Sequence, residues 1–129
     1  MESGVSAQES PFKGKTGLKR LWNACFYSLA GLKAAFKHED AFRQEVFLAA
    51  ILIPTAFLLT PDNLARALMI ASVLLLLIVE LINSAIEATV DRISLDNHQL
   101  AKRAKDIGSA SVLVAIVNLL VVWILAILA

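Results

Sequence analysis

The sequence predicts an all-α membrane protein with three transmembrane helices and an N-terminal amphipathic surface helix. Its 129 residues are 58% hydrophobic and their mean hydropathy is +0.71, which is more apolar than an ordinary soluble domain. The apolar residues form three long runs, and about twenty such residues span a bilayer. Of the twelve Lys and Arg residues, only Arg66 lies between the first and second runs. The positive-inside rule therefore places the N-terminus and the second connection in the cytoplasm.

Residues 1–16 are polar and lack periodicity, so we expect a mobile tail there, followed by a single domain over residues 17–129. From 17 to 38 the apolar residues recur at helical spacing, with Lys19 and Lys33 away from them. This pattern predicts an amphipathic helix that lies on the membrane with its basic side toward the headgroups. A helix that packs on its own protein is the alternative.

The three apolar runs predict transmembrane helices at about 42–60, 64–90 and 106–128. The first run is short for a span of about twenty residues and contains Pro54, so a neighbouring polar turn that includes Glu45 completes it. The second helix would be roughly 40 Å long, against a hydrocarbon thickness of about 30 Å. Its C-terminal end therefore emerges at the cytoplasmic interface. The third begins with small residues, which allow close contacts between helices.

A polar stripe marks the C-terminal end of the second predicted span. At about 100° per residue, five polar residues project within about 60° of one direction: Glu80, Asn83, Ser84, Glu87 and Asp91. An ionisable side chain in the middle of a bilayer costs about 2.5–3.5 kcal/mol even on insertion scales. Two glutamates and an asparagine on one face of a membrane helix therefore indicate a functional site.

The depths at which these acidic side chains would lie in the membrane indicate the kind of reaction they could catalyse. Glu87 at headgroup depth and Glu39 from the surface segment would supply two ligands for Mg²⁺, which prefers one or two carboxylates plus phosphate oxygens and water. Lys105 would neutralise a phosphate. Glu80 lies about 10 Å deeper and is the candidate general base. A base at that depth suits a lipid hydroxyl as phosphate acceptor, with a nucleotide approaching from the cytoplasm.

Two other classes of function fit the same stripe. One is an ion- or proton-conducting oligomer, and the other is a structural subunit in which the stripe is a polar contact between helices. Some residues also have simpler interpretations. His98 would be a loop residue that offers backbone contacts, and Trp123 would belong to an aromatic belt at the outer interface. No nucleic-acid partner is expected.

Four short segments carry a specific combined pattern: 39–45 (EDAFRQE), 80–87 (ELINSAIE), 90–92 (VDR) and 104–110 (AKDIGSA). Together they resemble the small prokaryotic diacylglycerol kinase family, over about residue 17 to the C-terminus. The resemblance implies a multi-pass homotrimer of the bacterial inner membrane, with active sites shared between neighbouring subunits. It also implies ATP and Mg²⁺ as cofactors and the conversion of diacylglycerol to phosphatidic acid.

The resemblance also implies roles for single residues. Glu80 and Asn83 would be catalytic, with Glu80 as the proton acceptor, and Glu39 and Glu87 would hold the metal. Nucleotide contacts would come from Arg20, Tyr27, Glu39, Glu87, His98, Lys105 and Asp106. Lipid contacts would come from Arg20, Ser28, Lys33, Phe36, Arg43, Gln44, Glu45, Glu80, Ser109 and Trp123.

Some positions depart from the family pattern. Lys33 and Phe36 stand where Arg and Trp are familiar, and Cys25 stands where Ala is expected. Lys keeps the charge of Arg but loses its fork geometry, which weakens that lipid contact. The undecaprenol kinases form a second branch of the family with the same fold and chemistry. Residues 42–45 and 108–109 look more like the diacylglycerol branch, so diacylglycerol is the expected acceptor and a polyprenol the alternative.

Overall fold

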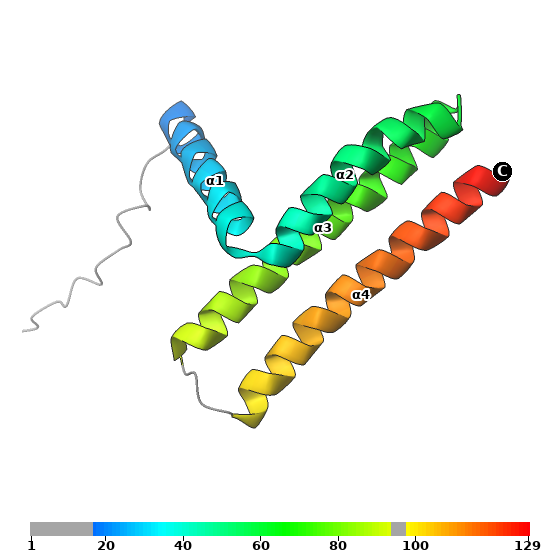
Figure 1. Ribbon diagram of the computed structural model, residues 1–129. Helices are drawn as coiled ribbons and strands as arrows, with labels where there is room; N and C mark the ends of the chain where they lie inside the picture. Colours follow the sequence, from blue (N-terminus) through cyan, green and yellow to red (C-terminus); the bar gives the residue numbers. More distant parts are fainter. Residues whose placement is uncertain (1–16, 94–97) are drawn as a thin grey trace, which may run out of the picture. The chain divides into compact units, whose positions relative to one another are not determined.

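A computed structural model describes residues 17–93 and 98–129, so the tail predicted at 1–16 lies outside the described residues. The described chain is entirely helical in its regular structure, with α1 at Leu18–His38, α2 at Asp40–Leu59, α3 at Asn63–Ile93 and α4 at Gln99–Leu128 (Figure 1). Helices α2, α3 and α4 are each long and apolar enough to cross a membrane. The predicted all-α class with three candidate spans is confirmed.

The helices are longer than the apolar runs that predicted them. Helix α4 begins at Gln99, well before the expected start at 106. His98 caps this helix because its Nδ1 accepts the backbone N–H of Leu100 at 3.1 Å. An ion pair of 2.6 Å between Lys102 and Asp106, one turn apart, supports the early turns. Charged turns of this kind are helical without being apolar, so hydropathy does not detect them.

The chain divides into two compact units within α1, the first ending at Lys33 and the second running from Ala34 to Ala129. In the first unit, the apolar side chains of α1 are exposed and no residue of this helix is buried. Trp22 and Phe26 contact each other edge to face, with ring centroids 5.2 Å apart. Exposed apolar side chains are expected of a helix whose apolar face lies in lipid. Its position on a membrane stays a prediction.

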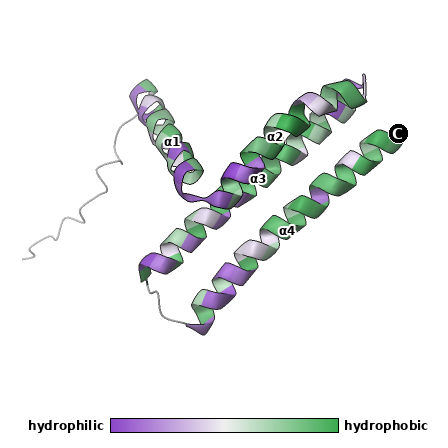
Figure 2. Cartoon of the chain, viewed as in Figure 1, coloured by the Kyte–Doolittle hydropathy of each residue, from purple (hydrophilic) through white to green (hydrophobic). Residues whose placement is uncertain are grey.

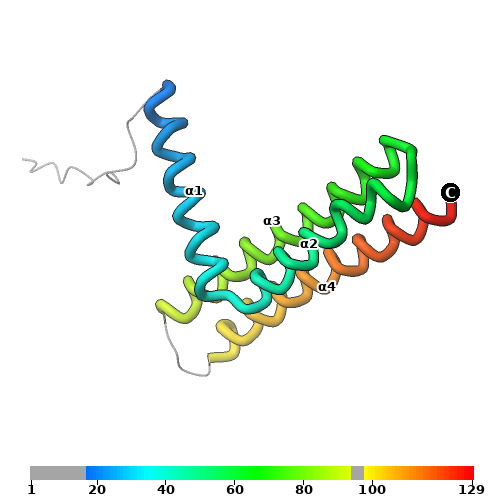
Figure 3. The backbone as a smooth tube through the Cα atoms, turned by 45° about the horizontal axis from the view of Figure 1, so that its top comes forward, coloured from blue at the N-terminus to red at the C-terminus, as the bar shows by residue number. Residues whose placement is uncertain are grey.

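In the second unit, α3 is the central helix, and α2 and α4 both pack against it (Figures 1 and 3). The core takes small residues from α2 and α4 and larger ones from α3 and α4: Ala49, Ala56, Met69, Val73, Leu76, Ala115, Leu119 and Trp123. Ala56 and Met69 have no exposed surface. Small side chains let helix backbones approach closely, which is how helices pack when lipid gives no hydrophobic driving force.

Asp62 and Arg66 close the turn between α2 and α3. The two carboxylate oxygens of Asp62 accept backbone N–H groups of the first turn of α3 at 3.3 and 3.2 Å. The guanidinium of Arg66 donates to the carbonyl oxygens of Thr60 at 2.7 Å and Phe57 at 3.0 Å, and it lies over the Phe57 ring. The one basic residue between the first two spans is therefore engaged at the end of α2.

Hydrophilic residues gather at the start of α2, the end of α3 and the start of α4, whereas the remainder of these helices is mostly hydrophobic (Figure 2). Helix α3 has 31 residues. At 1.5 Å per residue it is about 46 Å long, which exceeds a hydrocarbon core of about 30 Å. Its last turns therefore extend beyond the apolar zone, at the end of the bundle where the polar side chains collect.

Candidate active site

The exposure of the polar stripe on α3 increases toward the C-terminal end of that helix. Glu80 is 5% exposed, and Asn83 and Ser84 are also buried. Glu87 is half-buried and Asp91 is exposed. The buried members face neighbouring helices, because a side chain on the free surface of the helix could not lose its exposure. Glu80 thus lies at the buried end of the stripe, and Glu87 lies nearer to its solvent-exposed end.

Three other carboxylates surround Glu80. Glu39 and Glu87 interact with it electrostatically, and Glu45 lies within hydrogen-bonding reach of it. One carboxylate oxygen of Glu45, Oε2, is buried with no hydrogen-bond partner in the described part of the chain. We call Glu39, Glu45, Glu80 and Glu87 the acidic cluster. Neighbouring carboxylates repel one another while they are charged, and a bound cation would relieve that repulsion, which makes the cluster suited to a cationic partner.

Glu39 is placed by the junction between α1 and α2. It occupies the N-cap position of α2, where its backbone is extended, with φ −111° and ψ 105°. Its carbonyl oxygen accepts the N–H of Arg43 at 3.1 Å, and its own N–H donates to Ala35 at 2.9 Å. The carboxylate makes no capping hydrogen bond. The backbone is therefore fixed on both sides while the side chain remains available for a ligand.

Arg43 supports the same junction. Its guanidinium donates to the carbonyl oxygens of Phe36 at 2.8 Å and Lys37 at 2.9 Å, and it pairs with Asp40. These carbonyl groups belong to the last turn of α1, where the helix itself offers them no partner. Arg43 thus has a structural role at the junction, and the lipid contact expected for it stays a prediction.

Asn83 connects the buried and half-buried parts of the stripe. Its Nδ2 donates to Oε1 of Glu87 at 3.3 Å. The contact spans one turn of α3, which is the spacing at which helical side chains meet. Asn83 therefore orients the Glu87 carboxylate, and Glu87 keeps its second oxygen for another partner.

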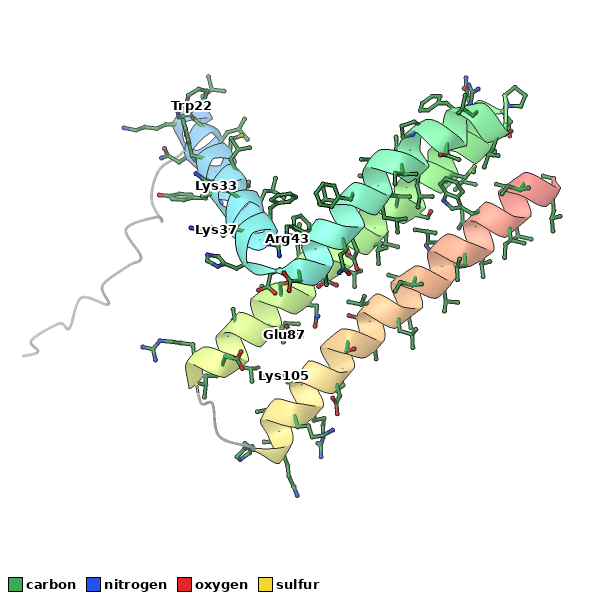
Figure 4. The ribbon with its side chains drawn as sticks, in the orientation of Figure 1. Trp22, Lys33, Lys37, Arg43, Glu87 and Lys105 are labelled. Atoms are coloured by element: carbon green, nitrogen blue, oxygen red, sulfur yellow. The ribbon has the colours of Figure 1, made fainter. Side chains whose placement is uncertain are left out.

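Helix α4 brings a cation to the end of the stripe. Lys105 Nζ lies 2.6 Å from Asp91 Oδ1 and also interacts electrostatically with Glu87. Figure 4 shows Lys105 on α4 near Glu87 on α3. The pairing of Lys105 with Asp91 was not predicted, although Asp91 had been placed on the stripe. The position of Asp91 on the same helical face as Glu87 was a usable signal for this pair. The sequence does not give the alignment of α4 along α3, which decides which acidic residue Lys105 meets.

The remaining predicted site residues are not all brought together. Arg20, Tyr27, Ser28 and Lys33 lie on α1 in the first unit, all exposed. Five further predicted site residues, in the second unit, are also exposed: Phe36, Gln44, His98, Asp106 and Ser109. Phe36 contacts Phe47 edge to face, with ring centroids 5.9 Å apart. The nucleotide or lipid contacts expected of these residues stay predictions.

Trp123 lies in the core, far from the acidic cluster. It is 8% exposed, and its Nε1 donates to the carbonyl oxygen of Met69 and to Ser72 Oγ, each at 3.2 Å. Along α4 it is about 27 Å from Lys105 at 1.5 Å per residue. In this chain Trp123 joins α4 to α3. The structure does not bring it to the other candidate site residues.

The acidic residues fit a magnesium ion that arrives with a nucleotide. Among residues 17–93 and 98–129, no three His, Cys, Asp or Glu side chains come close enough to enclose a metal ion. Mg²⁺ rarely needs such a cage, because phosphate oxygens and water complete its coordination. Glu39 and Glu87, which both interact with Glu80, would supply the one or two carboxylates required.

Comparisons with known proteins give consistent results. A model of the family described as "Prokaryotic diacylglycerol kinase" matches residues 26–127. A diacylglycerol kinase of Pseudomonas aeruginosa is 63% identical over 114 residues, covering 88% of this chain and 93% of its own length. Diacylglycerol kinases of Haemophilus influenzae and Escherichia coli K12 are 55% and 48% identical, each over 108 residues and 84% of this chain, and over 92% and 88% of their own lengths.

Proposed function

The chain belongs to the prokaryotic diacylglycerol kinase family, and from that premise we propose that it transfers the γ-phosphoryl group of ATP to the hydroxyl group of diacylglycerol. One observation carries the proposal. Glu80, buried on a helix long enough to span a membrane, lies among three further carboxylates. An ionisable group kept in such a segment at a large energetic cost is a functional group by default.

Glu80 acts as the general base in this proposal. It accepts the proton of the diacylglycerol hydroxyl as that oxygen attacks the γ-phosphorus of ATP. The bond between the γ-phosphorus and the bridging oxygen breaks, and ADP leaves. Glu80 then releases its proton to water as phosphatidic acid departs. Ser84, one turn further along α3, is buried beside Glu80 and interacts with its carboxylate.

Charge on the transferring group is balanced from two sides. Glu39 and Glu87 would hold Mg²⁺, which would neutralise phosphate oxygens and orient the nucleotide. Lys105 supplies a second positive charge from α4, held near Glu87 by its pair with Asp91. Phosphoryl transfer depends mainly on positioning and charge neutralisation, and these are the tasks of this group of residues.

The substrates are assigned to the two sides of the acidic cluster. Diacylglycerol would approach from the lipid, past Gln44 and Glu45 on α2 and Ser109 on α4. ATP would approach from the cytoplasm, toward Lys105 and Asp106. The exposure of Gln44, Asp106 and Ser109 supports these assignments, because a ligand can reach each of these side chains.

We also propose that the enzyme works as a homotrimer in the bacterial inner membrane, with its N-terminus and active site on the cytoplasmic side. The distribution of Lys and Arg supports the orientation. The buried Glu45 oxygen has no hydrogen-bond partner within the described chain, and a neighbouring subunit would supply one.

The proposal is tested with purified protein in mixed micelles and labelled ATP. We expect phosphate transfer to diacylglycerol, and transfer to undecaprenol at a much lower rate. Glu87→Gln should lower kcat at least about 100-fold, because it removes one of the two carboxylates that would hold Mg²⁺ at the transferring phosphate. Thr89→Ala is the matched control, since Thr89 is exposed on the same turn and bonds only to its own helix.

Three results would contradict the proposal. Wild-type activity in Glu87→Gln would show that this carboxylate does not hold the metal. Preference for undecaprenol would move the enzyme to the other branch of its family. Conductance in liposomes without ATP consumption in the presence of either lipid would indicate an ion-conducting oligomer instead.

A further inference from the structure

Helix α4 lies very close to α3 where Gly108 meets Asn83. A Cβ atom added at Gly108 would lie 2.2 Å from Asn83 Oδ1 and 3.3 Å from Asn83 Cγ. The first distance is shorter than any tolerable contact, so only glycine fits while Asn83 keeps its position. Gly31, which is also helical, has nothing within 4 Å of the same added atom. The need for glycine is therefore specific to this contact.

The amide that Gly108 faces is enclosed on both sides. Asn83 is 7% exposed, and its Oδ1 is fully buried with no hydrogen-bond partner in the described part of the chain. Its Nδ2 donates to Glu87 Oε1 at 3.3 Å. The oxygen end is thus confined by the backbone of α4, and the nitrogen end is directed at the carboxylate. An amide carbonyl against a glycine Cα also allows a weak C–H···O contact.

We propose that Gly108 is a positioning residue for phosphoryl transfer: its missing side chain lets α4 enclose the Asn83 amide, and that amide holds the Glu87 carboxylate. The inference rests on the proposed function, in which Glu87 binds the metal of the nucleotide. Gly108 touches neither substrate nor metal, and it acts only through Asn83. A displaced amide would free the Glu87 carboxylate to rotate away from the acidic cluster.

The test compares four variants: Gly108→Ala, Asn83→Ala, the double variant and Gly31→Ala. Kinase kcat is measured with diacylglycerol, Tm in detergent reports folding, and electron paramagnetic resonance reports Mn²⁺ binding in the presence of a non-hydrolysable ATP analogue. We expect Gly108→Ala to lower kcat about 100-fold, the loss that a displacement of about 1 Å produces at an active site. Mn²⁺ binding should weaken in the same variant, while Gly31→Ala should match the wild type in all three measurements.

The double variant separates a specific contact from general damage. With Asn83 truncated, the added methyl group has nothing to displace, so the double variant should have the kcat, Mn²⁺ affinity and Tm of Asn83→Ala alone. Should Gly108→Ala fail to fold, recovery of folding in the double variant would still identify Asn83 as the group with which the methyl collides.

Several outcomes would overturn the inference. These are wild-type kinetics or unchanged Mn²⁺ affinity in Gly108→Ala, losses that multiply in the double variant, or a double variant that does not fold when Asn83→Ala does. A wild-type protein that phosphorylates neither lipid would instead refute the proposed function. The Mn²⁺ affinities and Tm values would still decide the role of Gly108.

Discussion

Among single residues, Asp91 determines where the Lys105 ammonium group can lie. Their 2.6 Å contact joins α3 to α4 at the polar end of the bundle. Both side chains are nearly half exposed, at 43% and 46%, so the pair contributes little to the stability of the fold. The pair instead orients the Lys105 side chain, because it keeps this flexible lysine near Glu87.

Asp91→Asn should therefore raise KM for ATP about 5-fold, within the small range that half-exposed ion pairs allow, while Tm stays unchanged. Lys105 would lose its orientation but keep its charge. Steady-state kinetics at saturating diacylglycerol measure the change. Arg103→Gln is the control, since it removes an exposed basic charge of the same helix without touching Lys105 or Asp106. An unchanged KM for ATP in Asp91→Asn would mean that the pair does not position the lysine.

Helical spacing alone placed Glu80, Asn83 and Glu87 on one face, and the structure has two of them buried and the third half-buried. The partners across helices were not predictable in the same way. The Asn83 contact with Gly108 depends on how α3 and α4 slide along each other, and that alignment results from packing of many side chains. Small residues at the start of α4 indicated close contact without indicating which residue they would meet.

At the scale of elements, Trp123 joins α4 to α3 through residues that are distant in the sequence. Its N–H donates to both Met69 O and Ser72 Oγ, and Ser72 Oγ donates in turn to Met69 O at 2.7 Å. Hydrogen bonds buried between helices in this way fix the alignment of α4 along α3. These hydrogen bonds lie toward the opposite end of the bundle from the acidic cluster.

Trp123→Phe should lower the free energy of unfolding by about 1–2 kcal/mol, because it removes one donor and leaves Ser72 less well satisfied. The kcat and the KM for diacylglycerol should change less than about twofold at low temperature, since the site is about 27 Å away. Unfolding in mixed detergent and a kinetic assay measure these values. Trp22→Phe, at an exposed position of α1, is the matched control. A raised KM for diacylglycerol with unchanged stability would assign Trp123 to lipid binding instead.

The existence of each helix was predictable, and several ends were not. The apolar runs identified α2, α3 and α4, and the amphipathic pattern identified α1 with its end at His38. The early start of α4 depends on the His98 cap and on charged turns, which hydropathy scores as polar connection. The junction at Glu39 depends on Arg43 reaching back to carbonyl oxygens of α1, and single-residue propensities do not describe such a contact.

For the whole molecule, the sequence determined the class well because lipid restricts the alternatives. A spanning segment must satisfy its own backbone, so long apolar runs become helices. The orientation is predicted from a different signal, the uneven distribution of basic residues, and it stays a prediction. Assembly has no comparable signal in a single chain, since the surfaces that meet lipid and those that meet another subunit are both apolar.

Orientation can be tested with thiol labelling in right-side-out spheroplasts. Cys25, the only cysteine of the chain, is exposed on α1 and should react with a membrane-impermeant reagent only after lysis. Asn63→Cys in a Cys25→Ala background should react before lysis, because Asn63 is exposed at the start of α3, next to the turn predicted to face outside. The reverse order of labelling would place the acidic cluster on the outer side, away from cytoplasmic ATP.

The decreasing burial along the acidic face of α3 has a consequence for turnover. An uncharged glycerol hydroxyl can rest beside the enclosed carboxyl group of Glu80, where 5% of the residue is exposed. The phosphomonoester that replaces it carries charge, and a charge at that depth is expensive. Exposure to water increases along the acidic face of α3 from Glu80 to Asp91. The charged product is therefore more stable toward Asp91 and moves in that direction as soon as it forms. Under the proposed reaction, phosphorylation itself drives the lipid away from Glu80 and frees that position for the next molecule.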